Sequence, residues 1–117
     1  MNQLLKAEEA ALLGLSVILN QTLLPYAWWW YWVLFLIPDI SMIGYLVNTK
    51  VGAALYNFAH HKGTAVLCFA LGIILSSTSW QFAGLLLLGH SSFDRILGYG
   101  LKYSDNFKNT HLGWLGK

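Results

Sequence analysis

Charged residues are what this sequence has least of. Only 10% of its 117 residues are Asp, Glu, Lys or Arg, whereas 56% are hydrophobic. A soluble domain usually carries about 25% charged residues, which cover its surface in water. So small a charged fraction excludes a soluble protein with an ordinary surface. Because the length suffices for one domain, we expect a single transmembrane domain over residues 1–117.

Several chemical signatures are absent as well. Cys68 is the single cysteine, so the chain cannot form an internal disulfide or a C-x-x-C redox pair. The sequence contains no glycine-rich nucleotide loop and no serine nucleophile elbow. The activity, if there is one, must therefore come from other side chains.

Long apolar segments take the place of these features. A helix needs about 20 mostly apolar residues to cross a bilayer. We predict four transmembrane helices, over residues 3–24, 28–47, 64–79 and 80–97. The stretch Lys50–Lys62 is too short and too polar to span, and we predict a short interfacial helix there. With an amphipathic C-terminal tail, the predicted fold is an all-α, polytopic membrane helix bundle.

The basic residues predict the orientation of this bundle. If the N-terminus is cytoplasmic, four spans place all 7 Lys and Arg residues on the cytoplasmic side. The two external turns, near PYAW and SSTSWQ, then carry no charge. We expect a multi-pass protein of the inner (plasma) membrane with both termini cytoplasmic. Its partners are membrane lipid and, as an open alternative, further copies of itself; nucleic acid is not expected, because topology explains the positive charge.

Asp39 is the most unusual residue in this arrangement. It follows Pro38 inside the second span, about 12 Å from the inner end of that span. An ionised carboxylate at such a depth costs several kcal/mol unless it is paired or hydrated. An acid inside the membrane is therefore a functional candidate by default.

Other ionisable groups fall in the same cytoplasmic half. His90 and Asp94 are four residues apart and share one helix face. Imidazole and carboxylate are the ligand types that divalent transition metals share. We therefore predict a site for a divalent metal, Zn, Mn or Fe, with candidate ligands Asp39, His60, His90, Asp94 and His111. Structural alternatives stay open: Glu8 can cap its helix, Asp94 can pair with Arg95, and His111 can lie near the lipid headgroups.

Five segments of the chain resemble one known family. They are KAE at Lys6–Glu8, PDISMIGYL at Pro38–Leu46, GAALYNFAH at Gly52–His60, GHSSFDRILGYGLKY at Gly89–Tyr103 and THLGWLG at Thr110–Gly116. In content and order they resemble the domain of unknown function 4260 family, small bacterial four-helix membrane proteins. The resemblance selects Glu8 over Glu9 and His60 over His61, and it includes Arg95. It implies a fold and a set of residues, but no reaction.

Three functions remain open at this point. The first is a metal-dependent hydrolase of a lipid or lipid-linked headgroup, in which Asp39 and Arg95 act with Glu8 as general base. The second is a proton or ion relay through Asp39 and the histidines. The third is an accessory membrane subunit whose polar network is purely structural.

Overall fold

A computed structural model describes residues 2–97, 100–101, 109–110 and 112–114. Helices form nearly all of the regular structure in this part of the chain. They are α1 (Asn2–Leu23), α2 (Trp28–Val33), the 3-10 helix η1 (Ile37–Leu46), α3 (Thr49–His60), α4 (Lys62–Ile74) and α5 (Thr78–Ile96). Two short antiparallel strands follow, β1 (Asn109–Thr110) and β2 (Gly113–Trp114). The all-α prediction is confirmed for the described chain, apart from this two-stranded hairpin.

The second predicted span is not one regular α-helix. It consists of α2, a turn and the ten-residue η1. Pro38 lies in the first turn of η1 and has no backbone N–H to donate, which weakens α-helical bonding at this point. The neighbouring backbone bonds tighten to three-residue spacing, from Ile37 to Leu34 and from Asp39 to Leu36, each at 3.0 Å. Asp39 therefore lies in a 3-10 helix, and its side chain does not take the direction that a continuous α-helix would give it.

The helix ends around the third and fourth helices follow from local sequence. The Asn48 side chain caps α3 by accepting a hydrogen bond from the Val51 N–H at 2.8 Å. A single extended residue, His61, separates α3 from α4. The chain therefore turns sharply between His60 and Lys62, and each of these residues is fixed at a helix end.

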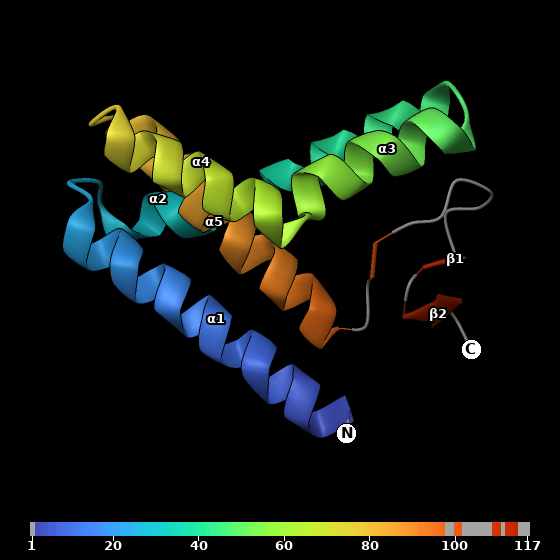
Figure 1. Cartoon of the computed structure of the whole chain (residues 1–117), viewed down its shortest axis with the longest axis horizontal. Coiled ribbons are helices and arrows are strands. Elements are labelled where there is room, and N and C mark those ends of the chain that lie inside the picture. Colours follow the sequence, from blue (N-terminus) through green and yellow to red (C-terminus); the bar gives the residue numbers. More distant parts are fainter. Residues whose placement is uncertain (1, 98–99, 102–108, 111, 115–117) are drawn as a thin grey trace.

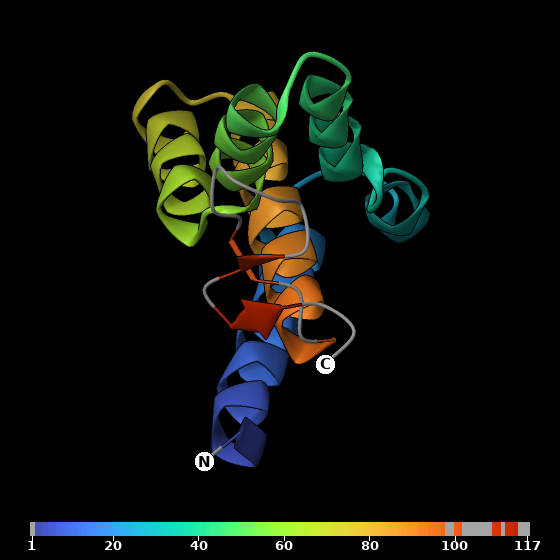
Figure 2. The ribbon, with the colours of Figure 1, turned by 90° about the vertical axis from the view of Figure 1, so that its right-hand side faces the viewer.

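Helix α5 forms the centre of the bundle. It packs along α1 and α4, whereas α3 packs along η1, and the end of this second pair reaches α5 (Figures 1 and 2). Glycines permit the close contacts: a Cβ at Gly84 would meet the backbone of Ala65 and Phe69 in α4. A Cβ at Gly89 would meet the Tyr31 hydroxyl and the Ser16 side chain. Small residues at helix contacts are typical of membrane bundles.

The surface of the described chain carries many large apolar side chains. Trp28, Leu46, Phe58 and Ile74 are each at least 60% exposed. Among the described residues, one helical stretch, Trp28–Leu46, is by length and composition long and apolar enough to cross a membrane. Helix α4 is apolar but has only 13 residues, about 20 Å against a hydrocarbon core of about 30 Å. The four-span arrangement therefore remains a prediction.

Candidate metal centre

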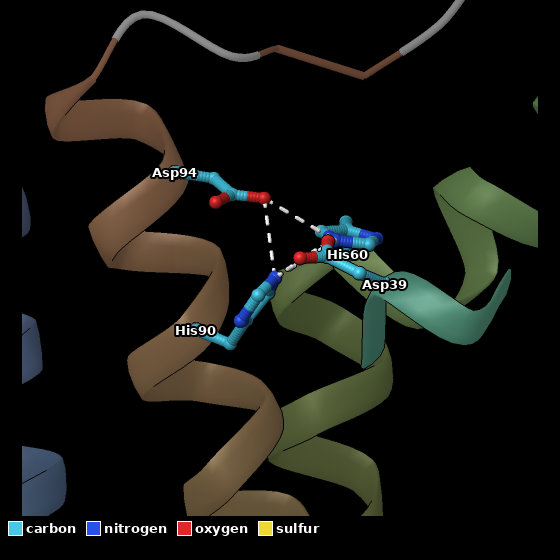
Figure 3. A group of neighbouring side chains, drawn as sticks. All are labelled: Asp39, His60, His90 and Asp94. Atoms are coloured by element: carbon cyan, nitrogen blue, oxygen red, sulfur yellow. Dashed lines mark hydrogen bonds and ion pairs between the residues drawn. The ribbon is translucent and has the colours of Figure 1, made fainter. Parts of the chain in front are cut away.

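Four predicted ligands from three helical elements meet at one point. Asp39 comes from η1, His60 from the last position of α3, and His90 and Asp94 from α5 (Figure 3). One ligand atom from each side chain lies within 4.8 Å of all the others. Residues that lie up to 55 positions apart in the sequence therefore share a single cluster, which we call the Asp–His cluster.

Five of the six separations between ligand atoms in the Asp–His cluster are short and nearly equal. Asp39 Oδ1 lies 3.2 Å from His60 Nε2 and 3.1 Å from His90 Nε2. Asp94 Oδ2 lies 3.2 and 3.3 Å from the same two nitrogen atoms. The two Nε2 atoms are 3.1 Å apart. Each imidazole thus faces the other imidazole and both carboxylates with the same nitrogen.

Backbone carbonyls determine where the hydrogens on these rings lie. His60 Nδ1 is 2.9 Å from the Tyr56 carbonyl oxygen, and His90 Nδ1 is 2.7 Å from the Phe35 carbonyl oxygen. A carbonyl oxygen only accepts hydrogen bonds, so each Nδ1 must carry the hydrogen. In the neutral rings, both Nε2 atoms are then bare lone pairs that point into the cluster.

The centre of the cluster therefore holds four acceptors. Two carboxylate oxygens and two Nε2 lone pairs repel one another unless something positive lies between them. Protonation relieves this repulsion when an Nε2–H donates to a carboxylate oxygen 3.1–3.3 Å away, although only one hydrogen fits between the two Nε2 atoms themselves. Either protons on the rings or a metal cation therefore satisfies the arrangement. Metal-binding histidines commonly donate the other ring N–H to a backbone carbonyl, as both do here.

Three of the four ligand side chains are buried, and the fourth is partly exposed. The side chains of His60, His90 and Asp94 are 0%, 1% and 11% exposed. The Asp39 side chain is 41% exposed. Asp39 is therefore the exposed member of the cluster, whereas the ligands on α3 and α5 are buried.

Comparison with known proteins identifies one family. The family described as "Domain of unknown function (DUF4260)" matches residues 2–115, nearly the whole chain. The chain belongs to the DUF4260 family. No curated protein and no solved structure matches it. The DUF4260 assignment confirms the expected family and supplies no reaction, so chemistry must be argued from the Asp–His cluster itself.

Tyr56 supports two of the ligands, and sequence reasoning missed it. Its hydroxyl donates to Asp94 Oδ2 at 3.4 Å, and its ring stacks on the His60 imidazole with 3.9 Å between centroids. Burial, together with the negative charges of Asp94 and Asp39, raises the pKa of Tyr56, so the phenol stays a hydrogen-bond donor. The available signal was its position one helical turn before His60.

The structure gives different outcomes for the other predicted residues. Glu8 is exposed and is not one of the residues that the structure brings to the Asp–His cluster, so its role as general base stays a prediction. The Arg95 guanidinium donates to the His60 backbone carbonyl at 3.2 Å, which places Arg95 beside the cluster. His111 lies outside the described residues. Glu9 forms an ion pair with Lys62, which sequence reasoning treated only as a topology signal.

Proposed function

We propose that this protein is an integral membrane metalloprotein whose Asp–His cluster binds one divalent transition-metal ion. The observation that carries this proposal is the convergence of two carboxylate oxygens and two Nε2 atoms within 4.8 Å of one another, with both Nδ1 atoms already directed at backbone carbonyls. A divalent cation removes the repulsion and satisfies all four atoms at once. Asp39, His60, His90 and Asp94 are the proposed ligands.

The spacing of the acceptors suits a tetrahedral ion. In a tetrahedron, ligand atoms are about 1.6 times as far from one another as from the metal. Zinc bonds of about 2.0–2.1 Å to nitrogen and oxygen therefore require separations of about 3.3 Å. Five of the six separations in the cluster lie between 3.1 and 3.3 Å, and all six lie within 4.8 Å. The five short separations match zinc, and manganese and iron are alternatives that accept the same ligands.

The membrane setting of the proposal rests on composition and charge. The exposed apolar side chains form a surface that suits lipid better than water. Four spans with cytoplasmic termini bring every basic residue to one side. Because α4 is short, it could span only if the bilayer thinned locally or if the polar residues that flank α4 extended toward the headgroups. The Asp–His cluster then lies toward the cytoplasmic face of an inner-membrane protein.

For activity, we propose hydrolysis of a lipid or lipid-linked headgroup. A divalent cation held by these four residues would have to accept a water molecule as a fifth ligand, and would lower the pKa of that water toward 7. Asp39 is the most exposed of the four ligands, so a headgroup would approach the centre from its side. Arg95, which already donates a hydrogen bond next to His60, supplies positive charge at that edge.

Metal content and turnover test this proposal separately. Detergent-purified protein, prepared without chelators, should hold about one zinc ion per chain, and Asp94→Asn should hold far less. The zinc-loaded protein should release headgroup or phosphate from inner-membrane phospholipids, and Asp94→Asn should not. Zinc without turnover would retain the metal centre and refute the hydrolase; less than about a tenth of an ion per chain would refute both.

One observation also favours a proton relay as a second candidate. A single proton between the two Nε2 atoms would satisfy the contact as well as a cation does. A relay predicts proton flux in proteoliposomes that Asp39→Asn abolishes and that added zinc inhibits. Flux that is unchanged in Asp39→Asn would rule this candidate out.

A further inference from the structure

A second charged group lies next to the Asp–His cluster. Lys62 Nζ, at the start of α4, donates to Glu9 Oε1 of α1. The two side chains are only 31% and 16% exposed. The other carboxylate oxygen, Glu9 Oε2, is buried and has no hydrogen-bond partner among the described residues. A buried carboxylate with one oxygen unsatisfied is held there at a cost.

Arg95, on α5, is a third charged residue in this group. Its guanidinium donates to the His60 carbonyl and also interacts electrostatically with Glu9 and Asp94. Lys62 follows His60 by two residues, and Arg95 directly follows Asp94. Both cations are therefore attached to segments that carry proposed metal ligands. The Glu9 carboxylate interacts with both of them.

The local charge decides which kind of ligand this place suits. The Asp–His cluster and its neighbours hold three carboxylates, of Glu9, Asp39 and Asp94, and two cations, Lys62 and Arg95. With neutral imidazoles the region carries a net charge of −1, and a divalent metal changes it to +1. A loaded centre therefore attracts anions, and among the described residues the Glu9 carboxylate interacts with both cations.

We propose that Lys62 and Arg95 form a binding site for a phosphate-type oxyanion beside the metal centre, and that Glu9 occupies this site when the ligand is absent. The inference rests on the proposed metal centre and names its substrate class: a phosphoryl group, from a lipid headgroup or from a soluble phosphate. Phosphate offers more acceptor oxygens than a carboxylate and matches the guanidinium fork. It therefore displaces a carboxylate that satisfies only one of its own oxygens.

Opposite effects of two substitutions test this exchange. In zinc-loaded protein, Glu9→Gln removes the competing charge and should tighten inorganic phosphate binding. Lys62→Gln removes a charged donor and should weaken it by about tenfold, as loss of a charge-assisted hydrogen bond predicts. Lys50→Gln removes an exposed charge at the start of α3 and serves as the matched control. Titration calorimetry with inorganic phosphate measures all four proteins.

A purely structural ion pair predicts a different pattern. Both Glu9→Gln and Lys62→Gln would then lower thermal stability and move phosphate affinity in the same direction or not at all, which would overturn the proposal. Zinc content is measured on the same samples: zinc bound without phosphate binding refutes only this inference, and absence of zinc in the wild type refutes the metal centre.

The source of the phosphoryl group is distinguished by a second arm. Nanodiscs that contain phosphatidic acid are compared with nanodiscs of phosphatidylcholine alone. Tighter zinc-dependent association of the Glu9→Gln protein with phosphatidic acid identifies a lipid headgroup. Phosphate binding in detergent without this lipid preference identifies a soluble phosphate, and failure of both probes overturns the proposal.

Discussion

His60 Nε2 and His90 Nε2 lie 3.1 Å apart, although each ring already directs its Nδ1 toward a backbone carbonyl. The contact therefore joins two atoms that are both acceptors in the neutral rings. Two carboxylates point at the same place from opposite elements (Figure 3). With neutral rings and ionised carboxylates, these four acceptors repel one another unless positive charge lies between them, and a metal ion supplies that charge.

Adjacent histidines provide the sharpest comparison for this inference. His60 is buried in the Asp–His cluster, whereas its neighbour His61 is exposed between α3 and α4. His60→Gln should lower zinc affinity by at least about 100-fold, because one of four ligands is lost. His61→Gln should leave zinc affinity unchanged. Competition with a chromogenic chelator measures both, and equal zinc affinity in the two variants would contradict the assignment.

Tyr56 should tune the centre without being a ligand. Tyr56→Phe keeps the ring that stacks on His60 and removes the hydroxyl that donates to Asp94. Loss of such a supporting hydrogen bond typically costs about 10–100-fold in metal affinity, and we expect the lower end because the bond is long. Tyr26→Phe removes an exposed hydroxyl that contacts Thr78 and is the control. A Tyr56→Phe protein with wild-type zinc affinity would refute the role of Tyr56.

Replacing Gly89 with alanine should lower the stability of the protein. A Cβ there would collide with the Tyr31 hydroxyl, so Gly89→Ala should destabilise the protein by about 1–3 kcal/mol. Gly14→Ala meets no atom within 4 Å and should be neutral or stabilising by up to about 1 kcal/mol. Thermal unfolding in detergent compares the two.

A second substitution separates this collision from a general helix effect. Tyr31→Phe removes the hydroxyl that a Cβ at Gly89 would meet, although it also loses the 2.8 Å hydrogen bond to Ser16. The double variant should therefore be more stable than the sum of the two single effects predicts. Simple additivity would show that the close contact at Gly89 is not the cause.

The sequence allowed the cluster members to be predicted, but not their contacts. Asp39 is conspicuous because an acid in an apolar span is costly, and the spacing of His90 and Asp94 alone places both on one helix face. The preference for His60 over His61 came from the family resemblance. Its geometric reason is the sharp turn at His61, which leaves His60 on the buried face of α3.

What sequence reasoning could not supply depends on long-range packing. The 3-10 helix that re-aims Asp39 reflects local bonding around Pro38 that a periodicity argument reads as a continuous helix. Glu9 and Lys62 lie 53 positions apart, so no spacing pattern connects them. The resemblance favoured Glu8, whereas it is Glu9 that the structure places within reach of Lys62 and Arg95.

The four-span topology has its own test. Both test cysteines are introduced into a Cys68→Ala background. Ser79→Cys lies in the first turn of α5, and Lys50→Cys lies at the start of α3. An impermeant maleimide added to intact cells should label Ser79→Cys and should reach Lys50→Cys only after permeabilisation. Labelling of Lys50→Cys in intact cells would contradict the cytoplasmic placement of the cluster.

X-ray absorption at the zinc edge of the zinc-loaded protein tests the central claim most directly. We expect about one zinc ion per chain with four or five nitrogen or oxygen neighbours at about 2.0–2.1 Å, and with outer-shell scattering from two imidazoles. A spectrum with a sulfur neighbour, or without imidazole scattering, would place the metal outside the Asp–His cluster and contradict the account.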